Sequence, residues 1–340
     1  MTEPVYSADA ARYEKMQYRR AGKSGVQLPL LSLGLWQNFG SHTPFQHAKQ
    51  LLHYAFDQGI CHFDLANNYG PEYGAAEETF GRVMASSFKP YRDELFISSK
   101  AGYDMWPGPY GNWGSRKYLM ASLDQSLRRM KLDYVDIFYS HRFDPNTPIE
   151  ETMQSLVDIV RQGKALYAGI SRYPYEHADR AYRYLAAHDV PCLLLQDRYN
   201  ILDRNIQERG VIDLTMDANA GLIVFSPLQQ GLLTGRYLSG IPSDSRMARN
   251  QSLRQSTLTP ELVAALRELN AMAERRGQSL AEMSLSWLMR DPSVSSVIVG
   301  ASSVEQLQDN LKAMSNLDFS PEELAAIDRI SEPHWIRQHP

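Results

Sequence analysis

Residues 61–70 read CHFDLANNYG, a short apolar run that ends in Asp64 and continues into polar residues and a glycine. Seven further apolar runs of this kind lie along the chain. They are LSLGLW (31–36), LFISSKAG (95–102), YVDIFYSH (134–141), ALYAGIS (165–171), CLLLQDRY (192–199), GLIVFSPL (221–228) and VSSVIVGA (294–301). Most are continuous rather than alternating, as expected of parallel strands covered on both faces. The sequence therefore predicts eight buried strands.

Amphipathic segments lie between these runs and predict helices. Examples are FQHAKQLLHYAFDQG (45–59), SRKYLMASLDQSLRRM (115–130) and IEETMQSLVDIVRQG (149–163), in which apolar residues recur every three or four positions. Gly59 and Gly163 are expected helix ends, and Ser115 is an expected N-cap. Eight strand–helix units predict an α/β protein with a closed (β/α)8 barrel, in a single domain over residues 1–340. No G-x-G-x-x-G follows a strand, which argues against a Rossmann domain.

Two segments lie outside the repeat. Residues 17–30 carry a Gly-Lys-Ser-Gly turn and predict an N-terminal hairpin that closes the bottom of the barrel. Residues 229–258 follow the seventh strand and are rich in Gly, Ser, Arg and Gln. A loop of this length is typical of a lid or a binding loop.

The composition excludes several classes of protein. Lys and Arg number 35 and Asp and Glu number 39, so the net charge of −4 argues against nucleic acid or an anionic membrane as a partner. The chain has no run of apolar residues long enough for a membrane span and no signal-peptide pattern, so we expect a cytoplasmic protein. Cys61 and Cys192 stand in apolar runs and are expected to be buried, free thiols.

Candidate catalytic residues stand where predicted strands end, the position of the site in barrels of this kind. Asp64, Lys100 and His141 end the second, third and fourth strands, and Tyr69 follows the second. The ammonium of Lys100 would favour the phenolate of Tyr69 and make the phenol a better proton donor, while Asp64 would serve as the counter-ion of the lysine. A hydrogen bond from His141 would hold a carbonyl oxygen. Together these groups predict acid–base chemistry at a carbonyl.

Each residue also has a structural interpretation when it is taken alone. Asp64 could cap a turn, Tyr69 could be a turn aromatic, Lys100 could be solvated and His141 could be a core histidine. Their convergence from three neighbouring strands favours a joint catalytic role. His62 and Asp64 form an H-x-D pair, which leaves a metal-dependent hydrolase or isomerase as an alternative. No second histidine cluster stands at the later strand ends, so no metal is expected.

Over nearly its whole length the chain resembles the aldo-keto reductases. The resemblance rests on FDLANNYG (63–70), ISSKAG (97–102) and YSHRFD (139–144). It implies carbonyl reduction by direct hydride transfer from NADPH (NADP+ in its oxidised form). It also implies a catalytic tetrad of Asp64, Tyr69, Lys100 and His141, with Tyr69 as the general acid.

The resemblance extends to the cofactor segments. GISRY (169–173), FSPLQQGLLTGRY (225–237) and GASSVEQLQDNL (300–311) are similar to the family's nicotinamide, pyrophosphate and adenosine segments. Gln306 stands where many members have a basic residue, so Arg236 and Arg246 are expected to bind the 2′-phosphate that distinguishes NADPH from NADH. The cofactor contacts that the resemblance implies are Trp36, Asp64, Ser171, Gln196, Phe225, Ser226, Leu228, Gln230, Gly231, Gly235, Arg236, Arg246, Ser302, Gln306 and Asn310.

KAGYDMWPGPYG (100–111) and DSRM (244–247) resemble the branch of the family that contains bacterial L-glyceraldehyde 3-phosphate reductases and potassium-channel β subunits. This implies a small aldehyde substrate, such as L-glyceraldehyde 3-phosphate or methylglyoxal, and a homo-oligomer (tetramer or octamer). The expected substrate contacts are Trp36, Tyr69, Trp106 and His141, with Tyr103 and Trp113 as further pocket walls and Arg116 and Arg142 as conceivable phosphate partners. The alternative is a redox-sensing regulatory subunit that binds nucleotide.

Two departures from the family pattern stand at strand ends. Arg172 follows Ser171 where the family usually has an asparagine, and Asp197-Arg198 follows Gln196 where Pro-Ser is expected. Only Ser171 of the first segment is therefore carried over as a cofactor contact. The second departure concerns the detail of the sixth strand end and not the fold.

Overall fold

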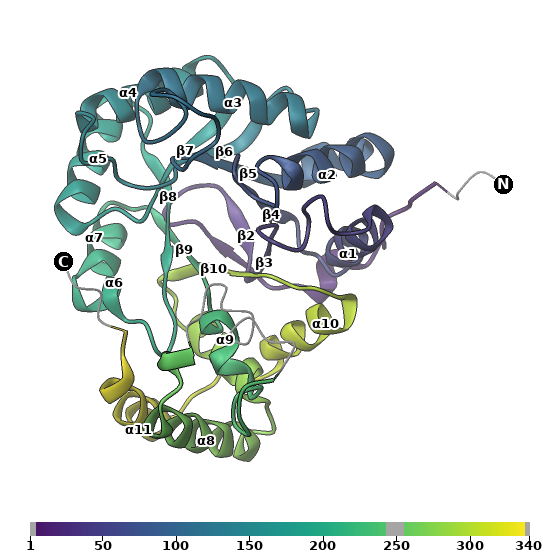
Figure 1. Cartoon of the computed structure of the whole chain (residues 1–340), viewed down its shortest axis with the longest axis vertical. Coiled ribbons are helices and arrows are strands. Elements are labelled where there is room, and N and C mark those ends of the chain that lie inside the picture. The colour runs from purple at the N-terminus through teal and green to yellow at the C-terminus, as the bar shows by residue number, and fades with distance from the viewer. Residues whose placement is uncertain (1–4, 243–254, 337–340) are drawn as a thin grey trace.

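The computed structural model describes residues 5–242 and 255–336, and its centre is a closed barrel of eight parallel strands. Going round the barrel, the strands follow the order β10, β3, β4, β5, β6, β7, β8 and β9 (Figure 1). Their bounds are β3 Leu31–Gly34, β4 His62–Asp64, β5 Phe96–Ala101, β6 Val135–Ser140, β7 Ala165–Ser171, β8 Cys192–Arg198, β9 Gly221–Phe225 and β10 Val294–Val299. Each coincides with one of the eight apolar runs, so the predicted (β/α)8 barrel is confirmed.

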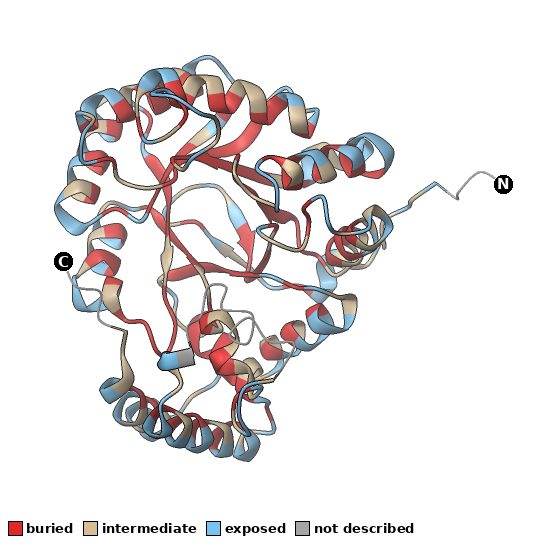
Figure 2. Cartoon of the chain, in the orientation of Figure 1, coloured by how far each residue is buried: buried red, intermediate tan, exposed pale blue. Residues whose placement is uncertain are grey.

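Helices surround the barrel and bury their inner faces against it (Figures 1 and 2). Ser115 caps α3 by accepting a hydrogen bond from the backbone of Tyr118, and Gly59 and Gly163 have positive φ just beyond α1 and α4, as expected. The helices are α1 Phe45–Asp57, α2 Ala75–Val83, α3 Arg116–Met130, α4 Ile149–Arg161, α5 Tyr175–Ala187, α6 Asn205–Glu208, α7 Val211–Asp217, α8 Pro260–Arg275, α9 Leu280–Met289, α10 Val304–Lys312 and α11 Pro321–Ser331.

The predicted hairpin is formed by β1 (Tyr18–Arg20) and β2 (Gln27–Pro29), which pair antiparallel. Arg19 donates to the carbonyls of Met289, Asp291 and Val294, where the chain enters β10. Gly22 lies so close to the chain before β9 that a Cβ would stand 2.1 Å from the carbonyl oxygen of Asn219. The hairpin therefore lies at the end of the barrel where strands begin, and the opposite end is left for the site.

The expected long loop after the seventh barrel strand is confirmed between β9 and α8. It begins with a short 3-10 segment, Gln229–Thr234, which lies close to the end of β9. Residues 243–254 lie outside the described part of the chain, and Arg246 is among them.

The barrel strands are buried (Figure 2), and the interior contains a chain of polar side chains as well as the apolar core. Ser32, His62, Ser98 and Ser296 are buried on four barrel strands. Ser296 donates to the carbonyl of Pro29 and contacts Ser32, which in turn lies 2.8 Å from His62 Nδ1. This chain runs from the hairpin towards the strand ends that carry the site.

Both cysteines are buried as free thiols, as expected. Burial raises the pKa of Cys61 and of Cys192 to about 12, so both thiols stay protonated and unreactive at neutral pH. Within the described ranges, no helix combines the length and the apolar character that crossing a membrane requires.

Candidate active site

Asp64 and Lys100 form a buried ion pair at the ends of β4 and β5. Lys100 Nζ lies 2.7 Å from Asp64 Oδ2, and the two residues are 0% and 2% exposed. The ammonium also donates to the carbonyl of Leu65 at 2.6 Å. Burial lowers the pKa of Lys100, while the charges of Asp64 and Glu77 oppose that shift. The carboxylate of Asp64 thus stabilises the positive charge of Lys100 although both side chains are buried.

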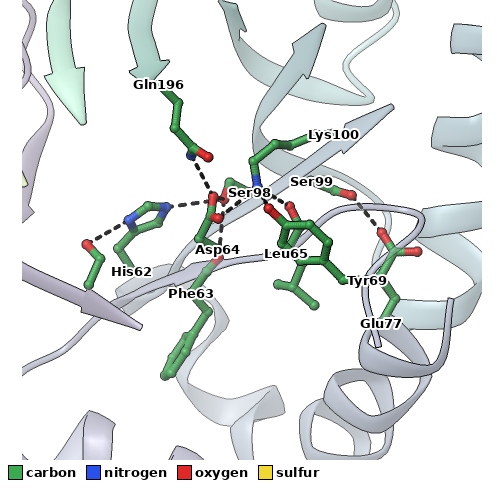
Figure 3. Close-up of polar contacts among 11 residues, drawn as sticks. His62, Phe63, Asp64, Leu65, Tyr69, Glu77, Ser98, Ser99, Lys100 and Gln196 are labelled. Atoms are coloured by element: carbon green, nitrogen blue, oxygen red, sulfur yellow. Dashed lines mark hydrogen bonds and ion pairs between the residues drawn. The ribbon is translucent and has the colours of Figure 1, made fainter. Parts of the chain in front are cut away.

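The second oxygen of Asp64 is held by two neutral donors (Figure 3). Ser98 Oγ donates to Asp64 Oδ1 at 2.8 Å, and Gln196 Nε2 donates to the same atom at 2.9 Å. Ser98 also lies 3.2 Å from Nε2 of His62. Burial lowers the pKa of His62 to about 4, so the imidazole is neutral at neutral pH. The carboxylate therefore has charged and hydroxyl partners from β5 and an amide partner from β8, which fix its orientation.

The alternative metal site at His62 and Asp64 is not supported by the geometry. The two ring nitrogens of His62 contact Ser32 and Ser98, and both carboxylate oxygens of Asp64 already accept hydrogen bonds. In residues 5–242 and 255–336 no group of three or more His, Cys, Asp or Glu side chains is arranged to hold an ion. The pair is built into the polar interior of the barrel.

Tyr69 lies beside the ammonium, as the sequence indicated. Lys100 Nζ donates to the phenol oxygen at 3.3 Å and lies 4.6 Å from the ring centroid. Burial, followed by the charge of Asp64, raises the pKa of Tyr69 well above 10.0. This differs from the expected shift towards the phenolate, because burial disfavours the charged phenolate and the charge of Asp64 acts in the same direction. The phenol is therefore fully protonated at rest, as a proton donor must be.

His141 completes the cluster from the end of β6. Its ring lies edge-on to the rings of Tyr69 and Tyr103, with centroids 5.8 Å and 4.7 Å away. Burial lowers the pKa of His141 well below 6.5, and the positive charges of Lys100, Arg172 and Arg142 act in the same direction. A neutral imidazole can donate one hydrogen bond to an oxygen without changing its charge.

The four residues meet at a cavity of about 770 Å3, a volume suited to a small-molecule or cofactor site. Lys100 lies behind the wall, and the other three line it. Of the residues expected to bind cofactor or substrate, the following line this main cavity: Trp36, Asp64, Tyr69, His141, Ser171, Gln196, Phe225, Ser226, Leu228, Gln230, Gly231, Arg236, Ser302 and Gln306. Tyr103 lines it as well.

Some expected contacts lie elsewhere. Trp106 does not line the main cavity, and its ring packs on Tyr118 with centroids 5.1 Å apart. Gly235 and Asn310 flank the lining without belonging to it, and Arg246 lies outside the described residues. Trp113 is also outside the lining and stacks with Arg142 instead.

Local strain and unpartnered polar atoms mark this cavity as a place that fits a nucleotide. Ser226, Gln229 and Gln230 all have positive φ, a conformation that non-glycine residues adopt rarely and that gathers at ligand-binding loops. Gln230 Oε1 in the lining, and Asn310 Nδ2 one helical turn beyond the lining residue Gln306, are buried without a hydrogen-bond partner in the described chain. Buried polar atoms normally have partners, so these two atoms fit the expected contacts to a dinucleotide.

Sequence analysis missed two groups at the site. Ser98 precedes Lys100 by two residues on β5, so strand alternation places both side chains on the same face and could have revealed it. Arg198 lines the main cavity together with Arg172. The sequence marked both arginines as departures from a family pattern, but not as residues of the cavity wall.

Comparison with known proteins gives concordant matches. The model of the Aldo/keto reductase family matches residues 30–332 of the chain. An L-glyceraldehyde 3-phosphate reductase of Escherichia coli O157:H7 is 56% identical over 329 residues, which cover 96% of this chain and 95% of that protein. A protein of Arabidopsis thaliana named "Probable voltage-gated potassium channel subunit beta" is 35% identical over 305 residues, covering 88% of this chain and 91% of that protein.

Proposed function

Because the chain belongs to the aldo/keto reductase family and is an oxidoreductase of that family, we propose that it reduces small aldehydes to alcohols with NADPH as hydride donor. The observation that carries this proposal is the contact of Lys100 with both Asp64 and Tyr69 beside a cavity of nucleotide size. The 56% identical relative is named as a reductase of L-glyceraldehyde 3-phosphate, which makes that aldehyde the first substrate to test. Methylglyoxal is the second, because the sequence resemblance implies a small aldehyde substrate.

Each residue of the site has a separate role in the reduction of the carbonyl. NADPH would supply the hydride to the carbonyl carbon. Tyr69 donates its phenolic proton to the carbonyl oxygen as negative charge develops there, and Lys100 stabilises the phenolate that remains. His141, neutral because of its burial, donates a hydrogen bond that orients the carbonyl. Asp64 keeps Lys100 charged and in place.

The cavity residues suggest how the cofactor is held. Ser171 and Gln196 stand beside Asp64 at the strand ends, where the resemblance expects carboxamide contacts, and Phe225 lines the same region. Ser302 and Gln306 line the cavity at the start of α10, where a helix N-terminus favours a phosphate. Arg236 also lines the cavity and is the described candidate for the 2′-phosphate.

The purified chain is expected to oxidise NADPH when DL-glyceraldehyde 3-phosphate or methylglyoxal is added, and to oxidise NADH more slowly. The reason is the extra charge-assisted contact between the 2′-phosphate and a guanidinium, which NADH lacks. The measurement is the loss of absorbance of the reduced nicotinamide at matched concentrations of the two cofactors. Equal rates with both cofactors would contradict the assignment of Arg236.

The alternative is a regulatory subunit that binds nucleotide with little turnover. Its support is the 35% identity to a protein named as a probable potassium-channel subunit. The higher identity to a named reductase favours the enzyme. Tight NADPH binding without oxidation by any of several aldehydes would favour the regulatory subunit instead.

A further inference from the structure

Two arginines that depart from the family pattern lie together in the wall of the main cavity. Arg172 follows the last residue of β7, and Arg198 ends β8, the neighbouring strand. Both also line a side cavity of about 120 Å3, which adjoins the main cavity through these two shared residues. The backbone of Arg172 has a φ of +54°, a strained conformation for a residue other than glycine.

A short chain of contacts links these arginines to the catalytic cluster. The ring of His141 contacts the rings of Tyr69 and Tyr103, and Arg172 Nη1 donates to the hydroxyl of Tyr103 at 2.8 Å. The positive charge of Arg172 also contributes to the lowered pKa of His141. A single tyrosine ring therefore separates the guanidinium from the imidazole that would hold the carbonyl.

Two carboxylates, Asp197 and Asp203, interact with the charges of both arginines, but they line the side cavity and not the main cavity. Arg172 has the neutral hydroxyl of Tyr103 as its hydrogen-bond partner, and Arg198 has a long ion pair of 3.7 Å with Asp203. Asp197 lines the side cavity, where burial raises its pKa to about 6 and the charges of Arg172 and Arg198 oppose that shift, so its carboxyl is still mostly ionised at neutral pH. Its Oδ1 accepts a hydrogen bond from the backbone N–H of Arg198. Both guanidinium groups line the main cavity, and their N–H groups can donate to further acceptors there.

Other cations near the site are already engaged. Arg142 donates to the carbonyl of Gly102 and to Asn112, and its guanidinium stacks 3.6 Å from the Trp113 ring centroid. Arg116 forms an ion pair with Asp158 and does not line the main cavity. Arg142 and Arg116 were the phosphate partners that the sequence suggested. The arginines that line the main cavity are Arg172 and Arg198 instead.

We infer that Arg172 and Arg198 form an anion subsite that recognises the phosphate group of a phosphorylated aldehyde while its carbonyl lies at Tyr69 and His141. This inference rests on the proposed reductase activity and specifies its substrate class. A phosphomonoester is a dianion with several acceptor oxygens, and two guanidinium groups match both its charge and its geometry. The subsite would make this chain prefer a phosphorylated aldehyde over the same aldehyde without phosphate.

The test compares DL-glyceraldehyde 3-phosphate with DL-glyceraldehyde at saturating NADPH, in wild type, Arg172→Gln and Arg198→Gln. Each substitution is expected to raise KM for the phosphorylated aldehyde about 10- to 100-fold, the effect of losing one hydrogen bond to a charged group. KM for DL-glyceraldehyde is expected to change little. Arg116→Gln is the matched control, since it removes an arginine outside the cavity, and circular dichroism checks that each variant is folded.

A binding experiment makes the inference independent of turnover. With NADP+ bound, calorimetry is expected to show that glycerol 3-phosphate binds the wild type and that the double variant R172Q/R198Q loses this binding. Equal binding to both proteins would overturn the subsite. So would weaker NADP+ binding in the variants with an unchanged preference between the aldehydes, because the arginines would then belong to the cofactor site. Absence of NADPH oxidation by any aldehyde, with glycerol 3-phosphate binding retained, would overturn the reductase and leave the subsite standing.

Discussion

Replacing Tyr69 with phenylalanine is expected to lower kcat for aldehyde reduction by about 10²- to 10⁴-fold, the usual contribution of general acid catalysis. The phenol oxygen is the atom that Lys100 contacts at 3.3 Å, and phenylalanine keeps the ring while it removes the proton. Binding of NADPH is expected to be unchanged, because the proton is transferred only in the chemical step. Stopped-flow or steady-state oxidation of NADPH, together with fluorescence titration of the cofactor, measures both quantities.

Tyr103 offers a matched control for this substitution. It is a second phenol in the wall of the same cavity, and its ring also lies edge-on to His141. Tyr103→Phe is expected to leave kcat for DL-glyceraldehyde within a few-fold of wild type, since this phenol donates no proton to the substrate. If Tyr69→Phe kept wild-type turnover, or if both substitutions reduced it equally, Tyr69 would not be the general acid.

Neither His141 nor Tyr69 is expected to contribute a change in kcat between pH 6.5 and pH 10.0. The pKa of His141 is lowered from 6.5, so the imidazole stays neutral above that pH. The pKa of Tyr69 is raised above 10.0, so the phenol keeps its proton up to that pH. A kinetic pKa near neutrality that disappeared in a His141 or Tyr69 variant would contradict these directions.

The barrel and the catalytic cluster were predictable because both follow from short-range rules. Eight continuous apolar runs separated by amphipathic segments leave few architectures other than a closed parallel barrel. Parallel strands also point the same way, so residues at the ends of successive strands lie close together. Asp64, Lys100 and His141 could therefore be grouped before any distance was known.

The walls of the cavity were less predictable because loops set them. Trp106 belongs to the loop between β5 and α3, where Met105 hydrogen-bonds Gly111, so its ring turns onto Tyr118 rather than into the cavity. Nothing in the sequence of that loop fixes this direction. Arg198 shows the opposite case, since strand alternation from Gln196 places it on the cavity side, but its role depends on Arg172 from the adjacent strand.

The polar interior also escaped prediction, although it supports the site. His62, Ser98 and Ser296 stand in runs that are otherwise apolar, and a lone polar residue in such a run gives no indication of its partner. The partners come from different strands and meet only when the barrel closes. The direction of the Tyr69 pKa shift has the same origin, because it depends first on burial and then on the nearby charge of Asp64, and both are set when the barrel closes.

Replacing Lys100 with methionine is expected to abolish turnover and to lower the free energy of unfolding by about 3–5 kcal/mol, the usual effect of removing one partner of a buried ion pair. Methionine has a similar length, so little cavity is created. The loss arises because Asp64, 2% exposed, would keep its charge with only the neutral donors Ser98 and Gln196. Urea unfolding measures the stability, and NADPH oxidation measures the turnover.

The double variant D64N/K100M separates the structural role of the pair from its chemical role. An asparagine at position 64 carries no charge, and its carbonyl oxygen can still accept from Ser98 and Gln196. Most of the lost stability is therefore expected to return, since replacing both members of a buried pair is often nearly neutral. Turnover is expected to remain absent, because no ammonium is left to stabilise the phenolate of Tyr69.

A K100M protein as stable as wild type would contradict the proposed role of the buried charge pair in stability. Recovered turnover in the double variant would show that the ammonium is dispensable, and the proton transfer from Tyr69 would then need another stabilising group.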